Sequence, residues 1–374
     1  MKKAWQASAA ILAVAVASTA TAQSSVTVYG IVDDGVGWTS NQGGHSNVQM
    51  LSGYMQGNRL GFLGHEDLGA GSSAVFRLES GFDNNTGTLS QGGRLFGRSA
   101  YVGVENKSYG TVTLGRQYDT NYDLLALYQF AKYWGSNGVL IGDNDNLFGT
   151  VRFSNSVKYT SPNIGGFNVS AMYAMSNVPS FEDNRAYSVT GRFEHGGLSV
   201  GAGFLQMDHP NPTDNPNGAA GNDYPAAFSF FKGSLLSPTT GVRRQQIFLS
   251  GGTYNFGKAQ IGVLYSHVNY RYLDGTSLHL NNYEISGEYF ITPALIAGLG
   301  YYYTNGAYSS PDVSPHWNQV DAGLDYLLSK RTDLYFYGVY QRAGAGARQA
   351  GIFLIPVSSS RQQTLVSAGI RHAF

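Results

Sequence analysis

The chain closes with Val366-Ser-Ala-Gly-Ile-Arg-His-Ala-Phe374, in which apolar residues alternate with polar or small ones up to an aromatic C-terminus. Val366, Ala368 and Ile370 fall on one face of an extended segment, and the residues between them fall on the other. This period of two predicts a half-buried β-strand. A last strand that faces lipid on one side and water on the other, and ends at an aromatic belt, is typical of a closed outer-membrane barrel.

The opposite end of the chain predicts export. Lys2 and Lys3 precede a short apolar stretch at 9–17, and Ala20-Thr-Ala22 has the small residues of a cleavage site. We therefore expect residues 1–22 to be a secretory signal peptide and residues 23–374 to be the mature domain. The alternative, a transmembrane anchor, needs about 20 apolar residues, and this stretch is too short.

Composition also favours a barrel over a soluble protein. Apart from the stretch at 9–17, each apolar run of the chain is interrupted by Gly, Asn, Asp or Arg, so none of these runs could span a bilayer as a helix. The remaining way to satisfy the hydrogen bonds of a backbone inside lipid is a closed β-barrel. Charged residues make up 13% of the chain, about half of the fraction usual in soluble domains. Strand positions that face lipid cannot carry charge, which accounts for this deficit.

The sequence also argues against several classes of function. It has no Cys, so no disulfide framework holds the exported chain. Its 24 basic and 24 acidic residues balance, which leaves no overall field to attract nucleic acid. The nucleophile elbow, the H-E-x-x-H zinc motif and the P-loop do not occur in it. We therefore expect no enzyme, no cofactor, no metal site and no nucleic-acid partner.

Strand patterns recur along the whole mature chain, clearly so at 74–79, 282–289 and 319–326. Their number predicts an all-β fold, a transmembrane antiparallel β-barrel of about 16 strands. Tyr and Phe near strand ends, as at Tyr289 and 301–303, are expected to form interfacial girdles. Short turns alternate with long connectors, as periplasmic turns alternate with extracellular loops. The long connectors lie near 39–57, 85–93, 119–150, 177–184, 208–242, 271–276, 306–314 and 346–360.

A soluble β-sandwich or a secreted adhesin also shows alternating strands. Neither accounts for the terminal Phe374 or for the alternation of short and long connectors.

The chain resembles the trimeric general porins of Gram-negative outer membranes, most closely the β-proteobacterial type. The resemblance runs from the signal peptide to the C-terminus. It is carried by 26–33 (VTVYGIVD), 58–69 (NRLGFLGHEDLG), 76–82 (FRLESGF), 95–103 (LFGRSAYVG), 109–119 (YGTVTLGRQYD), 155–162 (NSVKYTSP), 329–333 (SKRTD) and 369–374 (GIRHAF).

This resemblance implies a 16-stranded barrel, a homotrimer in outer-membrane lipid and lipopolysaccharide, and a third loop that folds into the pore and constricts it. It also implies delivery by the barrel-assembly machinery through Phe374. Among the basic residues, Arg59, Arg98 and Arg152 match positions where the family places constriction arginines.

Basic residues cluster in the first half of the chain, and their parity along the strands predicts that they face the lumen. Arg77, for example, alternates with Phe76 and Leu78. An outward charge at the bilayer midplane would cost about 2–4 kcal/mol. Strand-end arginines can also simply solvate the wall, but a cluster of lumen cations would concentrate anions. The predicted basic wall of the constriction is Arg59, Arg77, Arg98, Arg116, Arg152 and Lys158.

The third loop (residues 119–150) is expected to supply the acidic side of the constriction. Its acids are Asp119, Asp123, Asp143 and Asp145, and Lys132 is its only basic residue. The stretch 142–146 (GDNDN) could also suggest a cation site, but it lacks EF-hand spacing. We therefore interpret it as a solvated acidic segment.

These observations predict a general diffusion porin of the outer membrane, in which small hydrophilic solutes and ions cross passively and anions are preferred. The main alternative is a substrate-specific channel with a binding site at the constriction. An outer-membrane hydrolase and an adhesive barrel are more distant alternatives, because neither leaves a recognisable motif here.

Overall fold

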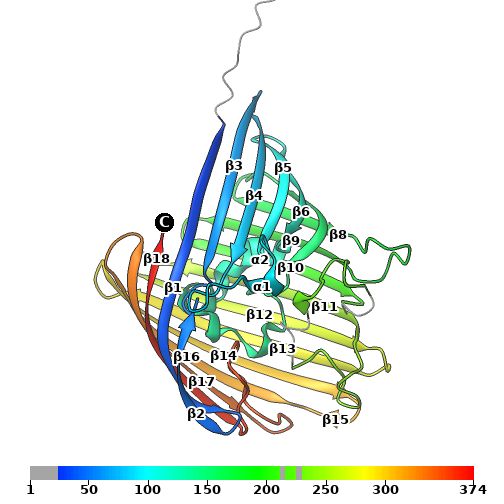
Figure 1. Cartoon of the computed structure of the whole chain (residues 1–374), viewed down its shortest axis with the longest axis vertical. Coiled ribbons are helices and arrows are strands. Elements are labelled where there is room, and N and C mark those ends of the chain that lie inside the picture. Colours follow the sequence, from blue (N-terminus) through cyan, green and yellow to red (C-terminus); the bar gives the residue numbers. More distant parts are fainter. Residues whose placement is uncertain (1–23, 211–214, 225–229) are drawn as a thin grey trace, which may run out of the picture.

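The computed structural model describes residues 24–210, 215–224 and 230–374, which form one closed antiparallel β-barrel (Figure 1). The predicted signal peptide, residues 1–22, and the expected first mature residue Gln23 lie outside the described residues. Throughout the described part of the chain, no helix has the length and apolar character to cross a membrane.

The elements follow one another in chain order, and the helical segments whose bounds are given below lie in the loops at 82–98 and 118–152. The strands are β1 (Ser25–Gln42), β2 (His45–Ser52), β3 (Arg59–Gly69), β4 (Ser72–Gly81), β5 (Ser99–Asn106), β6 (Gly110–Gln117), β7 (Phe153–Thr160), β8 (Phe167–Ala174), β9 (Arg185–His195), β10 (Leu198–Asp208), β11 (Val242–Asn255), β12 (Ala259–Tyr272), β13 (Ser277–Phe290), β14 (Leu295–Ser309), β15 (Asp312–Val313), β16 (His316–Leu327), β17 (Thr332–Ala343) and β18 (Gln362–Ala373). The helical segments are α1 (Ser90–Gly93), α2 (Thr120–Leu125), η1 (Ala126–Tyr128), α3 (Ala131–Trp134), η2 (Ser136–Gly138) and η3 (Ile141–Asp143).

These eighteen segments make sixteen barrel strands, which confirms the predicted number. β2 and β3 both pair with β1, β3 along Ser25–Ile31 and β2 from Asp34 onward, so they are two halves of one strand interrupted at 53–58. β15 is a two-residue segment that pairs with the end of β14 ahead of β16.

The prediction of a long first loop at 39–57 was wrong. β1 and β2 continue through most of it and turn tightly at Gly43-Gly44, where both residues have positive φ. Such a turn favours glycine because a side chain would strain this conformation. The sequence did not indicate these strand segments because the stretch is polar and rich in glycine, with little alternation of apolar and polar residues.

The barrel closes where the first strand pairs with the last. β1 pairs with β18 from Ile31↔Ala373 to Thr39↔Leu365. Beyond this register, Gly30 N–H donates to Phe374 O at 3.0 Å, and Phe374 N–H donates to Gly30 O at 3.1 Å. The predicted terminal strand therefore forms the closing seam, which Figure 1 shows as the contact between β18 and β1.

The alternation of side chains follows the predicted parity. On β16, Val320 and Leu324 are 40% and 45% exposed on the outer face, whereas Asp321 is fully buried inside. The aromatic stretch 301–303 is split by the same rule, because Tyr301 is 41% exposed and Tyr302 only 2%. Tyr302 therefore packs in the interior, and the expectation that all three tyrosines join the girdle was wrong.

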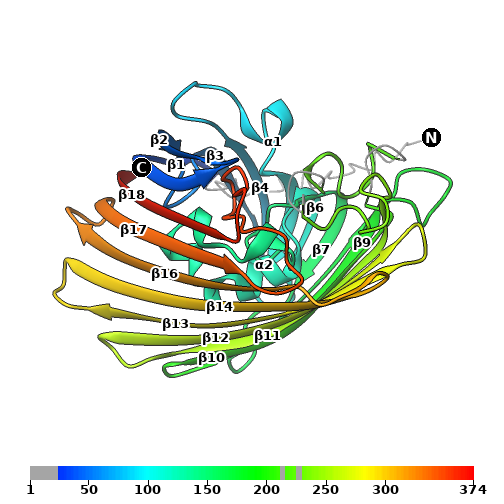
Figure 2. The ribbon, with the colours of Figure 1, turned by 90° about the horizontal axis from the view of Figure 1, so that it is seen from below.

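The third loop connects β6 to β7 and lies inside the barrel. Its segment α2 packs against β9 and β10, and Figure 2 shows α2 within the ring of strands. Several hydrogen bonds fix the loop to the opposite wall; for example, Phe130 N–H donates to Glu284 Oε1 at 2.6 Å, and Gln319 Nε2 donates to Gly138 O at 2.8 Å. The loop therefore narrows the lumen from the side of β9–β17.

We expect Gly30→Ala to destabilise the closing seam. A Cβ there would lie 2.4 Å from Phe374 Cζ and 2.6 Å from Arg59 O, so ring and backbone must shift. Overpacking of this kind costs about 1–3 kcal/mol. The measurement is the free energy of unfolding in urea in lipid vesicles. Gly287→Ala, an outward glycine whose nearest Cβ contact is 3.5 Å, is the control. Equal stability of the two variants would contradict the role of this contact.

Candidate functional site

The predicted cations come from strands that are neighbours in the barrel. β3, β4, β5, β6 and β7 pair in this order, so side chains on their inner faces lie side by side. Arg98 and Arg152 immediately precede β5 and β7 at the extracellular ends of these strands. The structure therefore brings together the residues that sequence parity assigned to the basic wall, namely Arg59, Arg77, Arg98, Arg116, Arg152 and Lys158.

A pair of stacked tyrosines spaces the cations. The rings of Tyr118 and Tyr122 lie 3.9 Å apart and are nearly parallel. The guanidinium carbons of Arg152 and Arg98 lie 5.1 and 5.9 Å from the Tyr118 ring, which is the range of a cation–π interaction. Arg152 Nη2 also donates to Tyr118 OH at 3.3 Å. The Tyr118 ring thus contacts two like charges, those of Arg98 and Arg152.

Glu79 is an acid of the site that the sequence-based interpretation missed. Its Oε1 accepts a hydrogen bond from Arg98 Nε at 2.6 Å, and its Oε2 accepts one from Tyr29 OH at 2.6 Å. The signal was present in the sequence, because Glu79 lies two residues after Arg77 on β4 and shares its inward parity. The first counter-charge of the cluster therefore comes from the barrel wall rather than from the third loop.

A second acid, Asp223, reaches the cluster from the fifth loop (residues 209–241). Its Oδ1 accepts from Arg94 Nη1 at 2.8 Å, and its Oδ2 pairs with Arg116 Nη2. Oδ2 also accepts from Arg152 N–H at 3.3 Å. The carboxylate is only 4% exposed. Arg116 is thereby neutralised, and no local sequence signal placed Asp223 beside Arg94 and Arg116, which lie more than a hundred positions earlier in the chain.

The third loop contributes one acid that faces the cluster. Asp123 forms an ion pair with Lys158 Nζ, which also donates to Tyr118 O at 3.0 Å. Lys132 Nζ donates to Tyr122 OH at 2.6 Å. Burial is the main cause that lowers the pKa of Lys132 to about 8, with Arg59 and Arg98 acting in the same direction. Near neutral pH, Lys132 therefore remains mostly charged.

The other predicted acids of the loop do not face an open lumen. Asp119, Asp143 and Asp145 are each 0% exposed. Asp119 caps α2 by accepting from Asn121 N–H at 2.8 Å. Assigning these three to the acidic side of the constriction therefore needs correction: their carboxylates hold the fold of the loop.

The segment 142–146 is likewise packed rather than solvated. Asp143 accepts from Phe148 N–H and Thr150 N–H, and Asp145 accepts from Ser266 Oγ at 2.7 Å. Burial and the neighbouring Asp145 raise the pKa of Asp143 to about 8. Among the described residues, no group of acidic or histidine side chains is placed to hold a metal ion.

The remaining cations are incompletely balanced. Across the described ranges, no acidic oxygen lies within 4.0 Å of a side-chain nitrogen of Arg59, Arg77 or Arg152. Arg77 Nε and Arg152 Nε also lack a hydrogen-bond partner there. Arg98 and Arg152 line a cavity of about 370 Å³. The positive potential of these arginines would concentrate small anions in the cavity.

Comparison with known proteins gives a consistent result. A family model described as Gram-negative porin matches residues 7–346. The chain is 28% identical to an outer membrane porin protein of Bordetella pertussis, with 98% of each chain covered. It is also 28% identical to outer membrane porin protein 32 of Delftia acidovorans, again with 98% of each covered.

Solved structures agree with these relatives. An anion-selective porin from Comamonas acidovorans superposes with a TM-score of 0.74 at 25% identity, covering 94% of this chain and 100% of that one. The trimer form of OmpT from Vibrio cholerae superposes with a TM-score of 0.70 at 16% identity, covering 94% of this chain and 99% of that one, which shows the shared fold.

We expect Asp223→Asn to increase the preference for anions in the lumen. The change leaves Arg94 and Arg116 without their counter-charge. One charge at about 10 Å in water changes the free energy of each ion by about 0.4 kcal/mol, in opposite directions for chloride and potassium. Salt screening reduces this effect, which leaves a change of about twofold in their ratio. The measurement is the chloride-to-potassium permeability ratio in a planar bilayer.

The matched control for this variant is Asp274→Asn. Asp274 is a loop carboxylate that accepts from Thr276 N–H at 2.9 Å and has no arginine partner among the described residues. The same ratio in Asp223→Asn and wild type would contradict the assigned role of Asp223.

Proposed function

Because the chain belongs to the Gram-negative porin family, we propose that its cation cluster makes it an anion-preferring pore. The protein is a porin of the outer membrane, a general diffusion channel for small hydrophilic solutes. Solutes cross down their own gradient, so passage needs neither a cofactor nor an energy source. The charge of the narrowest part then decides which ions cross most readily.

The observation that carries this proposal is the imbalance of charge beside the third loop. Arg59, Arg77 and Arg152 have no acid within 4.0 Å among the described side chains, whereas Glu79, Asp123 and Asp223 each already pair with a cation. The Comamonas acidovorans porin, which shares this fold, is described as anion-selective. The balanced charge of the whole chain does not oppose the proposal, because dissolved salt screens the field of a charge beyond about 8–10 Å. Charges far from the narrowest part therefore have little effect on an ion that passes it.

A substrate-specific channel is the second candidate. The cavity of about 370 Å³ lined by Arg98 and Arg152 is of a size that holds a small molecule, and it has several polar groups in its wall. Saturable transport of one solute would favour this function over general diffusion. Neither candidate involves a catalytic step.

The proposal includes the assembly and surroundings of the pore. Relatives of this fold include a trimer form, and we propose a homotrimer embedded in outer-membrane lipid and lipopolysaccharide. We also propose that Phe374, whose backbone closes the barrel with Gly30, is the signal that the barrel-assembly machinery recognises. The proposed signal peptide at residues 1–22 would be cleaved before assembly.

We expect the reversal potential across a KCl gradient to favour chloride in the wild-type channel. Arg98→Gln and Arg152→Gln should each lower the chloride-to-potassium permeability ratio about twofold, because each removes one charge near the path. Arg331→Gln, which removes an exposed charge in a periplasmic turn, should leave the ratio unchanged.

Two results would contradict parts of the proposal separately. A wild-type channel that favours potassium would leave the porin function intact and exclude the electrostatic assignment. A folded barrel with no conductance would instead exclude an open pore and favour an enzyme or an adhesin.

We expect the preference for chloride to decrease as the pH rises through about 8. Lys132 is charged below its lowered pKa and neutral above it, so its positive charge near Tyr122 is lost on the alkaline side. The measurement is the permeability ratio from about pH 6 to about pH 9.5, with a decrease of about twofold at most. Lys132→Met should show the lower ratio throughout. A step of the same size in this variant would assign the titration to another group.

A further inference from the structure

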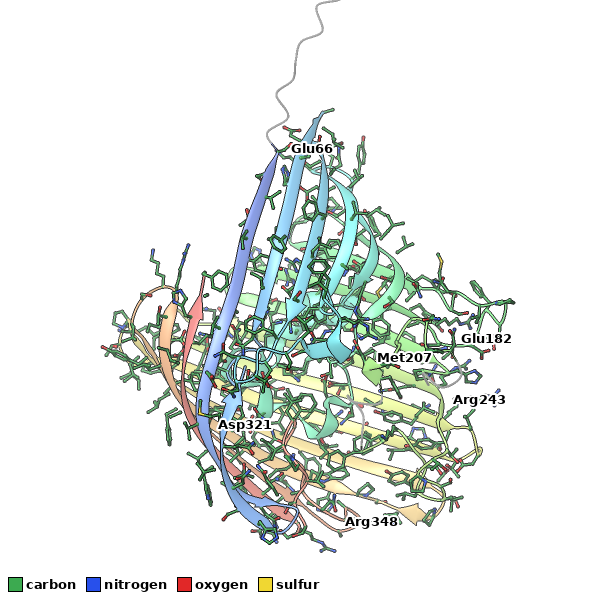
Figure 3. The ribbon with its side chains drawn as sticks, viewed as in Figure 1. Glu66, Glu182, Met207, Arg243, Asp321 and Arg348 are labelled. Carbon is green, nitrogen blue, oxygen red and sulfur yellow. The ribbon has the colours of Figure 1, made fainter. Side chains whose placement is uncertain are left out.

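A second cavity, of about 530 Å³, lies at the extracellular end of the barrel. Its lining comes from the fifth loop, from the connection between β14 and β16, and from the eighth loop (residues 344–361). Figure 1 shows this end of the barrel beside β15, and Figure 3 places Arg348 there. None of its lining residues belongs to the cavity beside Arg98 and Arg152, so the two cavities are separate.

Aromatic side chains form the walls of this mouth cavity. The rings of Phe231 and Trp317 meet edge to face at 6.0 Å, and the rings of Phe230 and Phe231 lie 6.2 Å apart. Hydrogen bonds hold this wall in place, because Trp317 Nε1 donates to Gln349 O and Tyr272 OH donates to Phe231 O, both at 3.1 Å. Phe231 and Trp317 are 1% and 6% exposed, so they form a fixed backing for Phe230, whose half-buried ring faces the cavity and can bind a flat apolar ring.

Two cations stand at the edge of the same cavity. Lys232 and Arg348 both line it and are exposed, and neither pairs with an acid within the described ranges. Two acids lie near it in sequence or space without lining it. Asp274 accepts from Ser234 Oγ and Thr276 Oγ1, and hydrogen bonds from these two residues lower its pKa. Asp312 lies in β15 next to the lining residue Val313.

We propose that the mouth cavity binds a small aromatic carboxylate, with its ring against Phe230, which Phe231 and Trp317 support from behind, and its carboxylate toward Lys232 and Arg348. A cavity of this volume fits the size range of small-ligand sites, which combine apolar walls with a few polar groups that orient the ligand. Arg348 can bind a carboxylate through two parallel hydrogen bonds, and Lys232 can add a point charge.

The location gives this site a role distinct from that of the constriction. A solute from outside meets the mouth before it reaches Arg98 and Arg152, so binding here raises its local concentration at the entrance. The site does not depend on the anion preference of the pore. A potassium-selective channel could still bind an aromatic carboxylate at its mouth, and the two proposals therefore fail independently.

The test is isothermal titration calorimetry of the full-length mature protein in lipid nanodiscs, with benzoate as the probe. Acetate has the charge without the ring, and benzyl alcohol has the ring without the charge. We expect benzoate to bind at least about fivefold more tightly than either, since an aromatic contact and an exposed ion pair each contribute up to about 1 kcal/mol. Equal binding of acetate or of benzyl alcohol would overturn the proposed ligand class.

Variants then locate the binding. The double variant Lys232→Gln with Arg348→Gln should weaken benzoate about fivefold, and Arg342→Gln, an exposed arginine on β17 that does not line the cavity, should leave it unchanged. Phe230→Ala should weaken benzoate by a similar factor. These side chains are exposed or half-buried, so the variants should fold; conductance checks this. Unchanged benzoate affinity in both the double variant and Phe230→Ala would overturn the assignment to this cavity.

Discussion

The closed ladder of backbone hydrogen bonds is the constraint on which everything else in this barrel depends. Inside a bilayer an unpaired backbone group costs several kcal/mol, so sixteen strands must pair in a complete ring. β1 and β18 complete it, and the chain ends where Phe374 exchanges two hydrogen bonds with Gly30. Because no strand edge remains free, no backbone group of the ring is left unpaired toward lipid, and apolar side chains such as Val320 and Leu324 can cover the outer face.

Closure also determines how the lumen is narrowed. The wall itself cannot bend inward without losing its ladder, so the third loop folds into the ring and binds it through polar contacts such as those of Glu284 and Gln319. The carboxylates of Asp143 and Asp145 accept hydrogen bonds from backbone N–H groups of the loop, and Asp145 also accepts one from Ser266 on β12. Acids that a sequence would assign to the pore are thus used to build the loop.

The resulting electrostatics are local and uneven. Five adjacent strands place guanidinium and ammonium groups on one side, and Tyr118 keeps Arg98 and Arg152 within cation–π distance of one ring. The acids that reach them come from different parts of the fold, Glu79 from the wall and Asp223 from the fifth loop. At the extracellular mouth, aromatic side chains and the exposed cations Lys232 and Arg348 again come together from different loops.

The sequence by itself determined the barrel, its approximate strand number and the inward direction of the arginines, because a period of two along each strand is a local property that lipid enforces at every position. The inward parity of Glu79 is a local property of the same kind, because it lies two residues after Arg77 on β4. Only the tertiary structure decided which acids face the cations. Loops have no periodicity, so nothing local distinguishes the buried Asp119 from the ion-paired Asp123, or brings Asp223 to Arg116. Those positions follow from long-range packing inside the closed ring, where a side chain's partner is set by the fold and not by its neighbours in the chain.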